Sequence, residues 1–199
     1  IGDLMYSVAI GIWVLEKTNS NFLMGIMSSI SLFVTMIVSP FSGAVVDKLN
    51  RKWVLILGDA FQGILMISIG FLAFSDKLSV PIVLIAAFLA SLGGVFYSPA
   101  SSTVLIDIIP REDLTRGQSI LSGVNSIISL IGSAFSGAVI TFLGVPLVII
   151  INGCSNIYSA ISELFISVPK TPKQGEKVSI SGIWSDTKIA VKTIFENPC

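Results

Sequence analysis

Four carboxylates inside otherwise apolar stretches are the side chains of this sequence best suited to chemistry. They are Asp3, Asp59, Asp107 and Glu163. An ionisable group surrounded by hydrocarbon is costly, which makes each one a candidate for proton binding or for pairing with a cation. The sequence has no histidine, which excludes imidazole catalysis and most metal sites. We therefore expect no metal ion, and we expect any proton transfer to use carboxylates.

The segment GAVVDKLNRK, residues 43–52, concentrates charge between two long apolar runs. Residues 22–46 hold no ionisable side chain in their apolar run, and residues 53–74 hold only Asp59. Each run exceeds the roughly 20 residues that cross about 30 Å of hydrocarbon. Neither run shows the polar stripe of 3.6-residue period that a soluble helix hairpin needs. The two runs therefore predict a transmembrane hairpin with a charged turn.

Composition extends this interpretation to the whole chain, which is 53% hydrophobic and 12% charged with a mean hydropathy of +0.89. Soluble domains carry roughly 25% charged residues. Hydropathy predicts six spans, and their short connections force sequential spans to run antiparallel as neighbours. The spans cover residues 1–15, 22–46, 53–74, 80–109, 119–142 and 146–168. We expect an all-α integral membrane bundle of six transmembrane helices over residues 1–168, embedded in the lipid bilayer.

The distribution of lysine and arginine predicts the orientation, because basic loops are retained in the cytoplasm. Ten of the 12 basic residues fall on one side, leaving Lys17 and Lys77 on the other. The ten are Lys48, Arg51, Lys52, Arg111, Arg116 and the five lysines after Val168. The turn at residues 43–52 and both chain ends are then cytoplasmic. Zero net charge argues against a nucleic-acid partner.

Residues 169–199 change in composition and predict a separate segment. They begin with a stretch rich in Pro, Gly, Ser and Lys, which is typical of a linker. Apolar residues then share one helical face over residues 183–195, which predicts an amphipathic helix packed on the bundle base or on the membrane surface. The chain starts inside an apolar run, so we expect a fragment with a truncated first span.

The charged turn resembles the loop between spans two and three of the major facilitator superfamily, whose signature is roughly GxxxDRxxRR. The matching positions are Gly43, Asp47, Lys48, Arg51 and Lys52. Lysine at position 48 keeps the charge of the commoner arginine but loses its planar fork. The stretches GDLMYSVAIGIWVLEKTNS and YSPASSTVLIDIIPREDLTRGQS are similar to the drug-exporter branch that includes macrolide-efflux proteins.

Two other patterns of that family are matched only in part. The fourth-span stretch FLASLGGVFY lacks the arginine that many proton-coupled members carry. The exporter pattern GPxxGG is present only as GSAFSG, in which Gly132 and Gly137 match. These two glycines are candidates for close helix packing.

The resemblance implies a secondary active transporter of twelve spans in two halves, with substrate held between the halves near the membrane midplane. This chain would be the first half, and its partner would be the missing C-terminal half of the same chain. The function expected is proton-driven efflux of a small amphiphilic, macrolide-like compound, with no cofactor besides the proton gradient. Spans one, two, four and five would line the cavity, which makes Tyr6, Tyr97 and Asn125 candidate substrate residues or, alternatively, interhelical anchors.

The charged turn has two compatible interpretations. Its basic residues can simply hold the loop in the cytoplasm, or the whole motif can act as a gate that binds the opposite half and stabilises the outward-facing state. Asp47 and Arg51, spaced i,i+4, could form an ion pair if the helix persists through the turn. A retention signal needs neither a fixed glycine nor an aspartate, which favours the added gating role.

The buried carboxylates divide by depth and by span. Asp107 can pair with Arg111 at a helix end. Asp59 and Glu163 lie on supporting spans, where a charge network with Arg51, Lys52, Arg111 or Arg116 is favoured over a proton site. Asp3 is about 20 Å from the outer end of a cavity-lining span. It is the candidate for proton coupling, although a bound water or a hydrogen bond to another helix is an equal alternative.

Three other functions compete with an exporter. An importer or uniporter would share the fold. An intramembrane aspartyl protease could use Asp59 and Asp107, but LGDAF at the first of these does not match GxGD, so we expect no enzyme activity. A non-transporting membrane scaffold is compatible with composition alone, and the resemblance argues against it.

Overall fold

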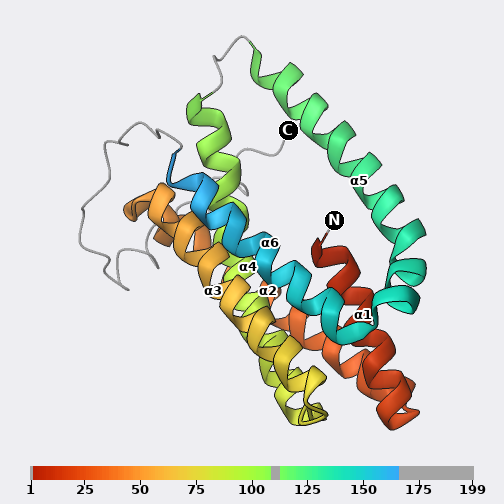
Figure 1. The fold of residues 1–199 in the computed structure, drawn as a ribbon. Helices are drawn as coiled ribbons and strands as arrows, with labels where there is room; N and C mark the ends of the chain where they lie inside the picture. Colours follow the sequence, from red (N-terminus) through yellow and green to blue (C-terminus); the bar gives the residue numbers. More distant parts are fainter. Residues whose placement is uncertain (1, 109–112, 166–199) are drawn as a thin grey trace.

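A computed structural model describes residues 2–108 and 113–165. For residues 105–108 it describes the backbone alone. This described part is all-helical, as predicted (Figure 1). Its helices are α1 Gly2–Thr18, α2 Asn21–Lys48, α3 Arg51–Phe74, α4 Val80–Ile108, α5 Leu114–Leu143 and α6 Val145–Glu163. The predicted linker and amphipathic helix at residues 169–199 lie outside the described residues, as does Arg111.

Polar side chains cap the N-terminal ends of α2 and α3. The Ser20 side chain accepts a hydrogen bond from the Leu23 amide at the start of α2, and Asn50 accepts one from the Lys52 amide at the start of α3. Both residue types are favoured at helix N-caps. Gly144 joins α5 to α6 with φ of +77°, a conformation that glycine adopts without steric cost. The α5–α6 connection is therefore a single residue.

Two predicted boundaries differ from the observed ones by five residues. Helix α5 begins at Leu114, five residues before the predicted start at Ser119, because the polar stretch LTRGQ is helical. Helix α6 ends at Glu163, before the predicted end at Val168. Hydropathy locates apolar stretches, so it misses a polar turn that extends a helix, as in α5, and an end that falls inside an apolar stretch, as in α6.

Five helices, α2 to α6, are long and apolar enough to cross a membrane. Helix α1 has 17 residues, slightly fewer than a typical span requires. Large apolar side chains such as Phe22, Met36 and Phe142 are exposed on the outside of the bundle. An apolar exterior is what lipid contact requires.

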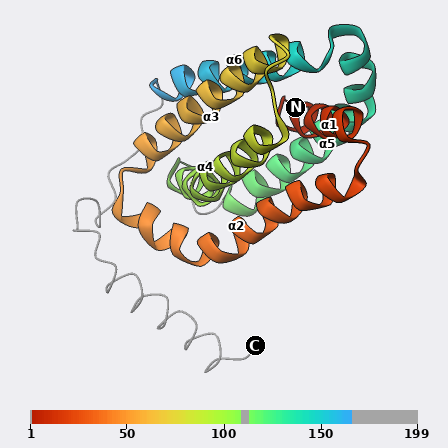
Figure 2. The same cartoon turned by 90° about the horizontal axis from the view of Figure 1, so that it is seen from below.

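The helices form layers around α1 and α4, which lie in the middle of the bundle (Figure 2). Helix α2 packs on α4 and α1 from one side, while α3 and α6 pack on them from the other. Helix α5 contacts mainly α1 and α6, and Figure 1 shows it reaching away from α3 and α4. The start of α1 and middle segments of α3, α4 and α6 therefore meet in the interior of the bundle.

Helices α3 and α6 share the most extensive contact of the bundle, and glycines allow it. A Cβ atom at Gly153 would lie 2.8 Å from the carbonyl oxygen of Gly63, and one at Gly63 would lie 2.9 Å from that of Gly153. The two backbones are thus in direct contact, as small residues permit in membrane helices.

Candidate functional site

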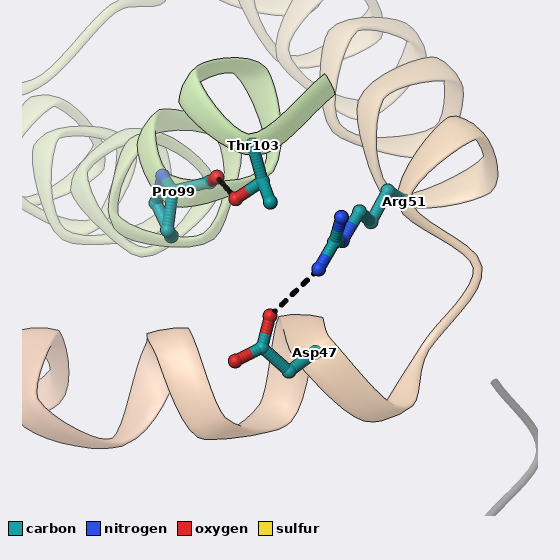
Figure 3. A network of polar contacts seen from close by, with 4 residues as sticks. All are labelled: Asp47, Arg51, Pro99 and Thr103. Carbon is teal, nitrogen blue, oxygen red and sulfur yellow. Dashed lines mark hydrogen bonds and ion pairs between the residues drawn. The ribbon is translucent and has the colours of Figure 1, made fainter. Parts of the chain in front are cut away.

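The charged turn is built by two helices and a break of two residues between them (Figure 3). Helix α2 ends at Lys48 and α3 begins at Arg51, so the helix does not persist through the turn. The guanidinium Nη2 of Arg51 nevertheless lies 3.0 Å from Asp47 Oδ1. The i,i+4 pair therefore joins the ends of two different helices.

Arg51 is buried although it sits at a helix start, with 7% of its surface exposed. Beneath it, Val46 of α2 and Leu55 of α3 pack with Ala100 and Val104 of α4. Figure 3 shows the α4 segment carrying Pro99 and Thr103 on the other side of Arg51 from Asp47. A buried cation needs a partner, which Asp47 supplies. The motif thus ties together the ends of α2, α3 and α4 on this side of the bundle.

Lys52 engages the end of α6. Its Nζ donates a hydrogen bond of 2.7 Å to the carbonyl oxygen of Leu164, the C-cap residue of α6. A cation at this position satisfies a carbonyl that the helix leaves unpaired and complements the negative end of the helix dipole. Lys48 lies half-buried in the last turn of α2. The basic residues of the turn therefore have structural contacts in addition to their charge.

A polar cavity of about 280 Å³ lies where α1, α3, α4 and α6 meet. Its carboxylates come from Asp3 of α1 and Asp59 of α3. Amides and hydroxyls complete the polar wall, contributed by Gln62, Tyr97, Asn152, Ser155, Asn156 and Ser159. Two of the four sequence candidates for proton chemistry thus face the same interior space.

Asp3 is hydrogen-bonded to α6. Its Oδ1 accepts a hydrogen bond of 3.2 Å from Asn152 Nδ2, and Asn152 is buried. Gly2 lies directly against the Asn152 side chain. This contact is the hydrogen bond to another helix that the sequence left open as an alternative.

Glu163 and Asp59 lie beside uncharged polar groups instead of the basic partners expected for a charge network. Glu163 Oε1 accepts a hydrogen bond of 3.4 Å from the Tyr97 hydroxyl, whereas Asp59 lines the cavity beside Ser159. Within residues 2–108 and 113–165, no ion pair joins either carboxylate to a lysine or arginine. Arg116 is exposed at the start of α5. Asp107 lies on α4, but its side chain and Arg111 are outside the described part.

The three candidate substrate residues do not form one site. Tyr6 lines a largely apolar cavity of about 500 Å³ between α1, α2 and α4. Tyr97 lines the polar cavity instead and bonds Glu163, while Asn125 is exposed on α5. Only Tyr6 therefore borders a space suited to an apolar ligand.

The two candidate packing glycines differ in their surroundings. A Cβ atom at Gly132 of α5 would touch Leu4 of α1 at 3.0 Å, so this glycine lies in the α1–α5 contact. Gly137 faces open space in the described part of the chain. The glycines with the shortest contacts to backbone atoms, Gly63 and Gly153, escaped the sequence interpretation because no family pattern marks them.

The polar wall contributed by α6 could have been found by its spacing. Asn152, Ser155, Ser159 and Glu163 recur three or four residues apart in an otherwise apolar helix, which places them on one face. Asp59 and Gln62 of α3 are likewise three apart. Two polar stripes on neighbouring helices are the signal of a shared polar interior.

Comparison of the sequence with known proteins relates this chain to a family. A family model described as Major Facilitator Superfamily matches residues 1–198. Macrolide efflux protein A of Streptococcus pyogenes is 24% identical over 178 residues, which is 89% of this chain and 43% of that protein.

Two further relatives are described as an exporter and as a multidrug resistance protein. A proposed bacilysin exporter, BacE, of Bacillus amyloliquefaciens is 27% identical over 146 residues, which is 73% of this chain and 36% of the relative. A proposed multidrug resistance protein, MdtD, of Yersinia pestis (strain Pestoides F) is 23% identical over 146 residues, 73% of this chain and 30% of the relative. The chain thus spans less than half the length of these relatives.

Proposed function

Because the chain belongs to the major facilitator superfamily, we propose that it is the first half of a secondary active exporter of a small amphiphilic compound. In this proposal the complete protein has a second six-helix half, and substrate binds between the halves near the membrane midplane. The driving force is an inward proton gradient. The turn at residues 43–52 and both ends of this half face the cytoplasm.

The apolar cavity that Tyr6 lines supports an amphiphilic substrate. Besides Tyr6, its wall is formed by aliphatic side chains such as Ile10, Met27 and Leu32, with serine hydroxyls between them. Mostly apolar walls with a few polar groups are typical of sites for drug-sized amphiphilic molecules. The cavity contains no charged side chain in the described part of the chain, which disfavours sugars and anions. The macrolide and bacilysin relatives support export.

Efflux from cells tests this function. Cells that produce the complete protein are expected to accumulate several-fold less of a radiolabelled macrolide, or of fluorescent amphiphilic compounds, than cells with an empty vector. A protonophore should restore accumulation. Unchanged accumulation across the whole panel would remove the exporter proposal, and faster uptake under the same gradient would favour an importer of the same fold.

The gating role of the turn predicts that Asp47→Asn slows efflux several-fold without changing membrane orientation. The substitution removes the negative charge that pairs with the buried Arg51 guanidinium but leaves every lysine and arginine in place. An open surface over Gly43, beside a cavity of about 420 Å³ between α2 and α4, supports docking of the second half here. Efflux rate and protease protection of the loop would be measured together.

A matched control for this prediction is Lys48→Arg, which restores the commoner family residue and keeps the charge. It should transport as the unmodified protein does. If Asp47→Asn also transports normally, the turn acts through its basic charge alone, as a retention signal.

A further inference from the structure

Two cavities lie between α2 and α4, which pack side by side (Figure 2). One is the apolar cavity of about 500 Å³ that Tyr6 lines, which also borders α1. The other, which we call the hydroxyl cavity, has a volume of about 420 Å³ and reaches Gly43. Its polar side chains are all hydroxyls, contributed by Thr35, Ser39, Ser42, Ser91 and Ser98. Ser91 lines both cavities, so the two spaces meet at this residue.

The junction of the two cavities is a pair of hydroxyls. Ser91 Oγ of α4 lies 2.9 Å from Ser31 Oγ of α2 and 2.7 Å from the Ala87 carbonyl oxygen, and Ser31 lines the apolar cavity. A hydroxyl carries one proton and two acceptor lone pairs. Ser91 therefore cannot donate to both neighbours at once, and the pair keeps acceptor capacity that the two helices do not use. A ligand hydroxyl at this junction can donate to it.

The wall of the hydroxyl cavity also offers donors and acceptors of its own. Two of its hydroxyls donate to carbonyls of their own helix, as is common for serine and threonine in apolar helices. The hydroxyls of Ser39 and Ser98 make no hydrogen bond among the described residues. Pro99 has no amide hydrogen, so the Val95 carbonyl in this wall lacks its usual helical donor. The wall can therefore both donate to a ligand and accept from it.

Neither cavity wall carries a charged side chain among the described residues. A charged ligand group that leaves water for such a wall loses its hydration and gains no ion pair, which is costly. A hydroxyl or carbonyl group instead exchanges hydrogen bonds with water for hydrogen bonds with the wall. The hydroxyl cavity therefore favours an uncharged polar group, while the adjoining apolar cavity favours a hydrophobic one.

Because the two cavities meet at Ser91, we propose that the substrate spans both of them and is an uncharged compound with two dissimilar ends. Its hydroxyl- or carbonyl-bearing end binds in the hydroxyl cavity, and its apolar body binds in the cavity that Tyr6 lines. Ser91 contacts the substrate where the two ends join and selects for the uncharged polar end. The volume of each cavity is within the roughly 300–1,000 Å³ typical of ligand sites. The proposal rests on the proposed function only in calling the bound compound a substrate.

Equilibrium binding to the purified complete protein in phosphatidylcholine nanodiscs tests the proposal. The probe is the radiolabelled naphthyl ether of glycerol, which joins an apolar ring system to two neutral hydroxyls. One comparison compound is its dimethyl ether, in which both hydroxyls are capped, and the other carries a trimethylammonium group in place of the terminal hydroxyl. After subtraction of binding to empty nanodiscs, we expect the diol to bind several-fold more tightly than either comparison compound.

Substitutions assign this preference to the junction. Ser91→Ala should weaken binding of the diol by roughly 3- to 10-fold, the effect of one lost hydrogen bond, and should leave binding of the dimethyl ether unchanged. Ser29→Ala is the matched control, because Ser29 is exposed on α2, donates to the Gly25 carbonyl of its own helix and lines neither cavity. It should bind all three compounds as the unmodified protein does. Ser98→Ala provides a second variant should Ser91→Ala not fold.

Three outcomes would overturn the proposal. They are no binding of the diol above the level of empty nanodiscs, binding of either comparison compound as tight as that of the diol, and a preference for the diol that persists undiminished in folded Ser91→Ala and Ser98→Ala proteins. These measurements need neither a gradient nor flux. Efflux from cells without a preference for the diol would therefore remove this proposal alone, and a Ser91-dependent preference without efflux would remove only the exporter.

Discussion

Asp3→Asn in the complete transporter is expected to abolish proton-coupled efflux while leaving expression intact. Asparagine has nearly the same shape as aspartate, and its side-chain oxygen can still accept the 3.2 Å hydrogen bond from Asn152. The substitution therefore removes only the charge and the capacity to bind a proton. Substrate efflux driven by an imposed pH gradient in proteoliposomes is the measurement, and we expect it to fall to the level of empty vesicles.

A second variant separates coupling from anchoring. Asn152→Ala breaks the hydrogen bond between α1 and α6 but leaves the Asp3 carboxylate in the cavity. If Asp3 serves chiefly as an anchor, Asn152→Ala should impair efflux as much as Asp3→Asn or more. If Asp3 carries the proton, efflux should survive in Asn152→Ala at a reduced rate. If coupled flux is undiminished in Asp3→Asn, Asp3 is not the coupling residue.

The helical framework was predictable because lipid imposes a simple rule on sequence. A span must be apolar for about 20 residues and must satisfy its backbone internally, so hydropathy alone located every helix. The family resemblance is confirmed by the match over residues 1–198. Boundaries were less predictable, as the early start of α5 at Leu114 shows. Polar residues can continue a helix beyond the membrane, and hydropathy carries no information about that extension.

Side-chain partners were predicted less well than helices. The Asp47–Arg51 pair was expected within a continuous helix, yet it spans a turn between α2 and α3. For Glu163 the sequence favoured a basic partner, and the structure gives Tyr97. Spacing along one helix restricts which residues share a face, but it does not determine which face of a neighbouring helix lies opposite. That choice depends on tertiary packing, which no single-helix pattern encodes.

The polar cavity illustrates the same limit. Each of its residues taken alone is compatible with a hydrogen bond between helices, so the sequence interpretation distributed Asp3, Asp59 and Tyr97 among three separate roles. Their convergence depends on how closely α3 and α6 approach each other. Glycines at that contact set the distance, and the position of the cavity wall therefore rests on residues that bear no functional group.

This dependence gives the second large prediction, that Gly153→Ala destabilises the complete protein. In an unobstructed helix, replacing glycine with alanine stabilises by roughly 1 kcal/mol. At Gly153 the added Cβ would lie 2.8 Å from both the Gly63 carbonyl oxygen and the Ile67 amide nitrogen. These are backbone atoms, which cannot rotate away as a side chain can. Overpacking of this kind costs typically 1–3 kcal/mol, so we expect a lower unfolding temperature and a lower yield of folded protein.

Gly25→Ala is the matched control, because the space around Gly25 of α2 is open in the described structure. The same substitution should leave the unfolding temperature unchanged or raise it there, so the two variants are expected to shift stability in opposite directions. Gly63→Ala should behave as Gly153→Ala does, since its Cβ would lie 2.9 Å from the Gly153 carbonyl oxygen. If Gly153→Ala and Gly25→Ala were equally stable, α3 and α6 could separate at little cost. The position of the cavity wall would then not depend on these glycines.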